Sequence, residues 1–405
     1  MASSSSRRSR ATGPAATGRR GVGGALEIDA LLQDRTRDII VCCGSGGVGK
    51  TTTSAALALR AAEQGRRVCV LTIDPARRLA QSLGLRELDN IPRPVAGVDD
   101  AKGGRLDAMM LDMKRTFDDV VEAHASPEKA QQILANPFYI ALSSSFAGTQ
   151  EYMAMEKLGQ LHASTVADSD GGGSTWDLIV VDTPPSRSAL DFLDAPERLS
   201  SLLDGRFMRL MIAPARGPAR VLTAGLSLVT NAMNRVLGAQ LLTDVQAFIA
   251  ALDTVFGGFR QRADATFRLL QADETAFVVV ATPEPDAIRE ASYFAERLTN
   301  EHMPLAGLVV NRVHPDPTTI LSAADAESGA QRLADGDRGS DAAATADLLK
   351  VHAARARQSV RESAVAKRFT AAHPQVPTVP VPALSTDVHD LAGLRRIGDL
   401  LASGS

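Results

Sequence analysis

The chain has 405 residues, of which 44% are apolar and 22% charged, and its formal net charge is −3. This length allows one large domain or two ordinary ones, and the composition excludes a chain that is disordered throughout. The nearly balanced charge gives no reason to expect a nucleic-acid partner, and the sequence has no apolar run of the roughly eighteen residues that a membrane-spanning helix needs.

The first 26 residues are basic and rich in serine, glycine and alanine. They lack the apolar core of a signal peptide. We therefore expect residues 1–35 to form a flexible basic tail and leader. An arm that binds a membrane or nucleic acid is the alternative for this segment.

Short apolar runs recur along the rest of the chain, each long enough for a strand and too short for a helix. They are DIIVCC (38–43), RVCVLTI (67–73), LDAMMLDM (106–113), DLIVVD (177–182), AFVVVAT (276–282) and LAGLVVN (305–311). Continuous apolar runs are typical of strands covered on both faces, and helical patterns separate them. This alternation predicts an α/β fold with an open, doubly wound, mostly parallel sheet. A last run, 376–382, is broken by prolines and fits an edge strand or an extended loop.

Three regions interrupt this alternation within an expected single domain over 36–403. Residues 114–170 and 187–272 read as all-helical insertions. The second is apolar on more than one face, so it is either a helical layer on the sheet or a mobile subdomain that presents an apolar groove. Residues 315–345 are rich in Ala, Asp, Gly and Ser and read as a flexible insertion.

A glycine-rich loop follows the first buried strand and opens a helix, which is the context of a phosphate-binding loop. Its glycines let backbone N–H groups surround an oxyanion, and the helix N-terminus adds positive potential. Lys50 is expected to contact the β- and γ-phosphates of a nucleotide, and Thr51 to offer its hydroxyl to Mg²⁺. The candidate nucleotide-binding residues are Gly44, Ser45, Gly46, Gly47, Val48, Gly49, Lys50, Thr51 and Thr52.

Two aspartates end buried strands and are expected at the same edge of the sheet. Asp182 is the candidate for the Mg²⁺ shell. Asp74, fixed by Pro75, is the candidate that orients or polarises the attacking water. For Asp74 the alternative is a helix cap ahead of the segment ARRLAQSLG.

Three motifs in order, GSGGVGKTT, TIDPARRLAQSLG and DTPPSRSALDFLDAP, resemble those of the ArsA-type ATPases. This family includes the bacterial arsenite-pump ATPase and the eukaryotic factor that delivers tail-anchored membrane proteins. The resemblance covers most of residues 36–400 and is closest to the paired ArsA-like anion-transporting ATPases of actinobacteria. It implies a P-loop NTPase with a deviant Walker A loop, ATP and Mg²⁺ as ligands, and Asp74 as the catalytic switch I aspartate. It also implies that Asn311 contacts adenine, with 380–384 completing the base pocket; Asn311 could equally be a turn residue.

The cysteines depart from the family pattern. The chain has three, Cys42, Cys43 and Cys69, and no CxxC pair. Adjacent strand positions point to opposite faces, so Cys42 and Cys43 are not expected to form a joint metal site. We therefore expect no zinc, no iron-sulfur cluster and no activation by arsenite, and a reducing cytosol is the natural compartment.

Ser45 departs from the family pattern too. In this class a lysine at this position reaches across a dimer to the partner's phosphates, as an arginine finger does. Serine cannot supply that charge. The resemblance therefore predicts a dimer, preferably a heterodimer with a lysine-bearing paralogue, whereas a homodimer would need another charge such as Arg77 or Arg187.

Taken together, these patterns predict a cytoplasmic Mg²⁺-dependent ATPase in which nucleotide state controls dimer closure and the helical region 187–272. An apolar output surface suits a hydrophobic protein client or a membrane partner, with peripheral membrane association. The alternative is a partition- or positioning-type ATPase switch that cycles on a membrane or nucleoid.

Overall fold

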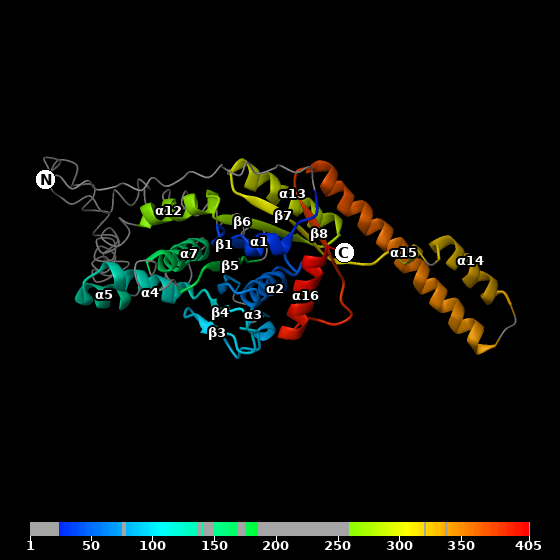
Figure 1. Ribbon diagram of the computed structural model, residues 1–405, viewed down its shortest axis with the longest axis horizontal. Coiled ribbons are helices and arrows are strands. Elements are labelled where there is room, and N and C mark those ends of the chain that lie inside the picture. Colours follow the sequence, from blue (N-terminus) through cyan, green and yellow to red (C-terminus); the bar gives the residue numbers. More distant parts are fainter. Residues whose placement is uncertain are drawn as a thin grey trace, which may run out of the picture.

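An eight-stranded sheet forms the centre of the molecule in the order β3-β4-β2-β5-β1-β6-β7-β8 (Figure 1). The computed structural model describes residues 24–74, 78–136, 139–140, 149–167, 175–184, 259–319, 321–336 and 339–404. The strands are β1 (Ile39–Cys43), β2 (Arg67–Thr72), β3 (Arg93–Pro94), β4 (Arg105–Met110), β5 (Leu178–Asp182), β6 (Thr275–Ala281), β7 (Leu305–Val313) and β8 (Thr378–Pro382). Every neighbouring pair is parallel except β3 with β4. The predicted doubly wound, mostly parallel sheet is therefore confirmed.

Helices cover the sheet on both faces, which is why the central strands are continuously apolar. In Figure 1, α12 (Phe259–Gln271) and α13 (Pro285–Asn300) lie above the sheet, and α2 (Lys50–Glu63) and α16 (Leu391–Ser403) lie below it. Every residue of β1, β5 and β6 is buried between these layers. The chain order reverses at β1, whose neighbours are β5 and β6, so the carboxyl end of β1 lies where ligands bind in such sheets.

Residues 24–35 of the leader have a defined structure, contrary to the flexibility predicted for this part of the segment 1–35. Leu26 N donates to Thr378 O at 3.1 Å, and Thr378 N donates to Gly24 O at 3.2 Å, so this segment pairs with the edge of β8. The following helix, α1 (Ile28–Gln33), buries Ile28 and Leu32 in the core. The burial of these apolar side chains stabilises the position of the leader against the sheet. Residues 1–23 lie outside the described ones.

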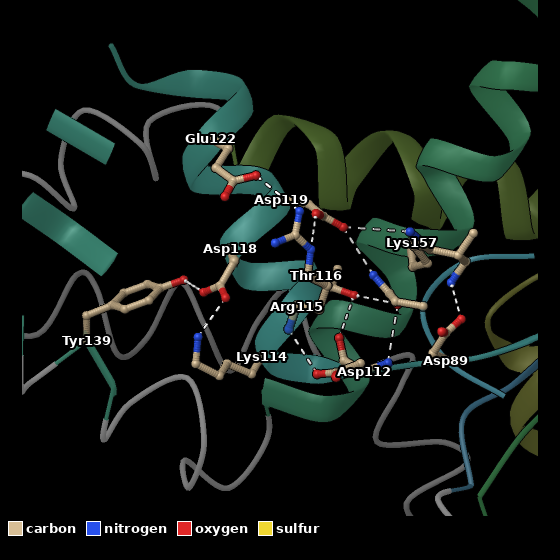
Figure 2. A network of polar contacts seen from close by, with 12 residues as sticks. Asp89, Asp112, Lys114, Arg115, Thr116, Asp118, Asp119, Glu122, Tyr139 and Lys157 are labelled. Carbon is tan, nitrogen blue, oxygen red and sulfur yellow. Dashed lines mark hydrogen bonds and ion pairs between the residues drawn. The ribbon is translucent and has the colours of Figure 1, made fainter. Parts of the chain in front are cut away.

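Three helices are described in the region of the predicted insertion over 114–170: α4 (Met113–His124), which begins one residue earlier, α5 (Pro127–Leu134) and α7 (Thr149–Ala167). A polar network holds α4 in place (Figure 2). Asn90 Nδ2 donates to Asp119 of α4 at 3.1 Å, and Lys157 of α7 lies 3.9 Å from the same carboxylate. Tyr139 OH donates to Asp118 at 2.7 Å. Asn90 and Tyr139 thus hold α4 to the segments that precede and follow it, and Lys157 joins it to α7. Of the predicted insertion over 187–272, residues 185–258 lie outside the described ones.

The predicted flexible insertion over 315–345 is wrong for its described residues, which are largely helical. After the short turn η2 (Pro317–Thr319) come α14 (Ala323–Ala334) and the long α15 (Ser340–Ala372). The two helices pack closely because alanines line their contact, namely Ala326 and Ala330 of α14 and Ala346, Ala353 and Ala356 of α15, all buried. Figure 1 shows this hairpin, the α14–α15 arm, projecting from the body. The alanine content that resembles a linker instead favours helix, because alanine is the best helix former.

None of the helices described is long and apolar enough to cross a bilayer.

Candidate functional site

The glycine-rich loop curls from the end of β1 into the first turn of α2. Gly44 passes so close to β6 that a Cβ there would lie 2.1 Å from the Val280 carbonyl oxygen. Gly49 has φ +96°, and its Cβ would lie 2.3 Å from Asn311 Nδ2. Glycine is required at both positions because a side chain would collide with the chain behind the loop. The loop is thereby pressed against β6 and β7 and shaped into an anion cradle.

Lys50 begins α2 and folds back over the loop. Its Nζ donates to the Ser45 carbonyl at 2.8 Å, and the residue is only 6% exposed. Burial lowers the pKa of Lys50, while the nearby Asp182 carboxylate acts in the opposite direction. The Lys50 ammonium is thus held beside the cradle, near Asp182 at the end of β5 and Asp74 just beyond β2.

Asp182 ends β5 and is fully buried. Its Oδ2 accepts a hydrogen bond from Thr72 Oγ1 at 3.0 Å. Its Oδ1 receives no hydrogen bond of ordinary geometry from any described residue. Burial raises the pKa of Asp182 to about 6, and the hydroxyls of Thr51 and Thr72 partly offset the increase. Oδ1 is therefore an orphaned acceptor beside Thr51.

Asp74 lies two residues beyond β2, the strand that pairs with β5. Its carbonyl oxygen is 3.4 Å from Thr72 Oγ1, and its carboxylate is close enough to raise the pKa of Asp182. Residue 74 is half-buried and lines the cleft in front of the loop. Arg77 and Arg187, the two alternative charges, lie outside the described residues.

Asn311 ties β7 to the loop. Its Nδ2 donates to the Val48 carbonyl at 2.8 Å, and its Oδ1 accepts from Arg312 N at 3.0 Å. Arg312 adopts φ +60°, a left-handed conformation unusual for a residue other than glycine. The amide therefore fixes both the loop and the backbone that follows β7. Its expected contact with adenine remains a prediction.

A cleft of about 1020 Å³, the main cleft, opens in front of the loop. Seven of the predicted nucleotide-binding residues line it together with Asp74, namely Gly46, Gly47, Gly49, Lys50, Thr51, Thr52 and Asn311. A second hollow of about 700 Å³, the side hollow, is lined by Ser45, Val48, Glu284, Glu290 and Arg312 among others. It shares Gly46, Gly47 and Arg312 with the main cleft. Gly44 and Asp182 line neither and support the loop from behind.

The main cleft also contains residues that the sequence patterns did not single out. Arg78 and Gln81 reach it from α3 (Arg78–Ser82), and both stand in the quoted segment TIDPARRLAQSLG. His314, Asp387 and His389 line it as well. Nothing in their local sequence marks them, because they reach the cleft only through the placement of β7 and β8.

The residues fit a bound nucleotide with a divalent cation. The glycine cradle and Lys50 suit phosphate oxygens, and a Cβ at Gly49 would close the loop against Asn311. Oxygen ligands suit Mg²⁺, and Thr51 and the orphaned Oδ1 of Asp182 supply two beside the cradle. Cys42 and Cys43 do not share a site: Cys42 is near Ser54 of α2, and Cys43 Sγ lies 3.9 Å from Val278 O.

Comparisons with known proteins agree with this geometry. The family model described as "Anion-transporting ATPase" matches residues 37–331. The chain is 25% identical to the ATPase get3 of Schizosaccharomyces japonicus over 294 residues, which cover 72% of this chain and 79% of that protein. It is 26% identical to an ATPase ASNA1 homolog of Cryptosporidium parvum over 286 residues, 71% of this chain and 68% of that protein. It is 27% identical to the ATPase GET3 of Ajellomyces dermatitidis, over 70% of this chain and 75% of that protein. The chain therefore belongs to the family of ArsA-type anion-transporting ATPases and is itself an ATPase.

Proposed function

We propose that the chain hydrolyses ATP with Mg²⁺ and that hydrolysis controls the association of two subunits. One observation supports the hydrolytic part of this proposal. Asp74 lies two residues beyond β2 and is half-buried in the main cleft, whereas Asp182 is the last residue of the paired strand β5 and is fully buried. Two carboxylates placed this way serve different roles, one toward water and one toward a cation.

The residues divide the reaction among them. The glycine loop and Lys50 hold the β- and γ-phosphates, and Asn311 with the segment 380–384 receives the base. Thr51 and Asp182 hold the Mg²⁺ shell. When bound, Mg²⁺ neutralises charge on the phosphate oxygens. Asp74 orients the attacking water and accepts its proton.

The test is phosphate release by the purified chain with ATP, with Mg²⁺ or with excess chelator. Asp74→Asn should lower turnover by about 10²- to 10⁴-fold, the usual value of a general base, and leave ATP affinity within a few-fold. Asp347→Asn is the matched control, because this aspartate is 75% exposed on the arm and pairs only locally with Lys350. Wild-type turnover in the Asp74→Asn variant would remove the proposed role of that residue.

The assembly that we propose is a heterodimer with a lysine-bearing paralogue. Ser45 supports it, because its short neutral side chain has no charge to give to a second nucleotide, and because it lines the side hollow rather than the main cleft. ATP turnover is measured for the chain alone and mixed with the paralogue. Equal turnover per site in both samples would favour a homodimer instead.

The output of the cycle, in this proposal, is an apolar surface in the region 187–272 that binds a hydrophobic protein client or a membrane partner. The apolar sequence of that region supports it, together with the resemblance to the factor that delivers tail-anchored proteins. Affinity capture with Asp74→Asn, stalled before hydrolysis, identifies a client. ATP-dependent sedimentation with liposomes or DNA but no captured client would favour the partition-type alternative.

A further inference from the structure

His314 is held by the α14–α15 arm. Its backbone N–H donates to Glu362 Oε2 at 2.9 Å, and its ring Nδ1 lies 2.8 Å from Oε1 of the same carboxylate. Gln358, one turn earlier on α15, donates to Oε1 at 2.8 Å, and Ser359 Oγ donates to the His314 carbonyl at 3.3 Å. One face of α15 therefore fixes both the backbone and the ring of His314.

The contact with Glu362 determines which ring nitrogen carries the proton. Two groups lie near Nδ1: Glu362 Oε1 at 2.8 Å and the Gln358 amide nitrogen at 3.2 Å. The carboxylate only accepts hydrogen bonds and is the closer of the two, so Nδ1 of His314 donates to it. In the neutral ring, Nε2 is then an acceptor. Nε2 makes no hydrogen bond with the described residues. The Glu362 side chain, which holds Nδ1, is only 11% exposed. The ring thus has one nitrogen anchored in the arm and one free acceptor.

His314 is also a lining residue of the main cleft. Its side chain is 26% exposed, and Asn311, three residues earlier, and Leu384 line the same cleft. Asn311 already touches the loop through Val48. His314 follows Asn311, the residue expected to contact adenine, by three positions along the chain and lines the same cleft.

We propose that His314, positioned by Glu362, recognises the nucleoside of the bound nucleotide through a hydrogen bond to Nε2. The ligand group is a hydrogen-bond donor, which is either a ribose hydroxyl or the exocyclic amine of adenine. The inference rests on the proposed binding of ATP in the main cleft. It makes the α14–α15 arm part of the nucleotide site, because α15 sets the orientation of the recognising ring.

The experiment compares dissociation constants for ATP, 2′-deoxy-ATP, 3′-deoxy-ATP and inosine triphosphate. Each analogue removes one candidate donor. The wild type should bind ATP about 3- to 10-fold more tightly than the analogue that lacks the recognised donor, as expected of one hydrogen bond. His314→Leu should weaken ATP binding by the same factor and abolish that preference while leaving the affinity for that analogue unchanged.

His352→Leu is the matched control. His352 Nε2 contacts the Leu321 carbonyl at 2.7 Å and so joins α15 to the same segment, but it is not among the described residues that line the main cleft. This variant should keep the wild-type preference. Glu362→Gln tests the positioning role, because an amide can donate to Nδ1, reverse the tautomer and remove the acceptor at Nε2. It should lose the preference as His314→Leu does.

Three results would overturn the inference: a wild type without preference among the four nucleotides, a His314→Leu variant that keeps the preference, or a His352→Leu variant that loses it equally. A wild type that binds none of the nucleotides would instead refute the proposed function.

Discussion

Asn311 and Gly49 lie so close that any side chain at position 49 would strike the Asn311 amide, whose Nδ2 donates to the Val48 carbonyl at 2.8 Å. The phosphate loop is therefore shaped from behind by β7, a strand more than 250 residues later in the chain. The Asn311 amide contacts the loop and also lines the main cleft. Substitutions at Asn311 or Gly49 should therefore affect both the stability of the fold and the affinity for nucleotide.

Asn311→Ala should destabilise the protein by about 1–2 kcal/mol, because the Val48 carbonyl and the Arg312 N–H both lose a partner. It should also weaken ATP binding. Chemical denaturation and a nucleotide titration measure the two effects. Asn90→Ala is the control, since Asn90 is also buried and hydrogen-bonded, but its partners Asp119 and Thr116 belong to α4. Its loss of stability should be similar and its ATP affinity normal. Equal ATP affinity in both variants would refute a role for Asn311 in the nucleotide site.

Gly49→Ala should abolish nucleotide binding and cost more stability than backbone strain alone. A left-handed residue other than glycine costs about 1–3 kcal/mol. Gly84→Ala isolates this cost, because Gly84 also has positive φ, +69°, but a Cβ added there would meet no atom within 4 Å. The difference in free energy of unfolding between the two variants reports the collision with Asn311. If both variants unfold alike and bind ATP alike, the loop is not fixed by β7.

The three cysteines should be unreactive in the native protein. Burial raises the pKa of Cys42 to about 12 and also raises the pKa values of Cys43 and Cys69. A raised pKa keeps a thiol protonated at every pH below it, so at pH 8 almost no thiolate is present to attack a disulfide reagent. Titration with such a reagent should detect no thiol in the native protein and three after denaturation. Arsenite should leave ATP turnover unchanged, and rapid labelling of native Cys42 or Cys43 would contradict this account.

Much of this fold follows from local sequence. Each predicted strand run contains a strand, because a buried parallel strand needs a continuous apolar run. The loop and the two aspartates also carry local signals. The short strand β3 and the position of His314 do not, since β3 exists only by pairing with β4, and His314 enters the main cleft only because Glu362, 48 residues later, holds it. The ordered structure of residues 24–35 could not be predicted from local sequence for the same reason. Leu26 and Ile28 become core residues only by packing against β8 and its neighbours.

The arm should respond to ATP. If His314 contacts the nucleoside, binding fixes the ring and, through Glu362, the inner half of α15. Hydrogen–deuterium exchange should slow at residues 355–369 and stay unchanged at 341–349, where α15 lies beyond this contact. The His314→Leu variant, saturated with ATP, should lack the difference between the two segments. Uniform slowing along α15 in both proteins would mean that the arm responds by another route.

Ser45→Lys should convert the chain into its own lysine donor. If turnover is limited by a missing charge, the variant alone should hydrolyse ATP at least about 10-fold faster than the wild type alone. The upper limit is the roughly 10³- to 10⁵-fold that such a charge can supply. Ser45→Met is the control, because it adds length without charge. Glu284 and Glu290 line the same side hollow and would attract the new ammonium within its own subunit, so Ser45→Lys is also measured with Glu290→Gln. Turnover should rise in Ser45→Lys but not in Ser45→Met, and it should rise further when Glu290→Gln is added. This combination would indicate that the new charge acts on a second subunit. A Ser45→Lys variant no faster than Ser45→Met in either background would show that the serine is not what limits the chain.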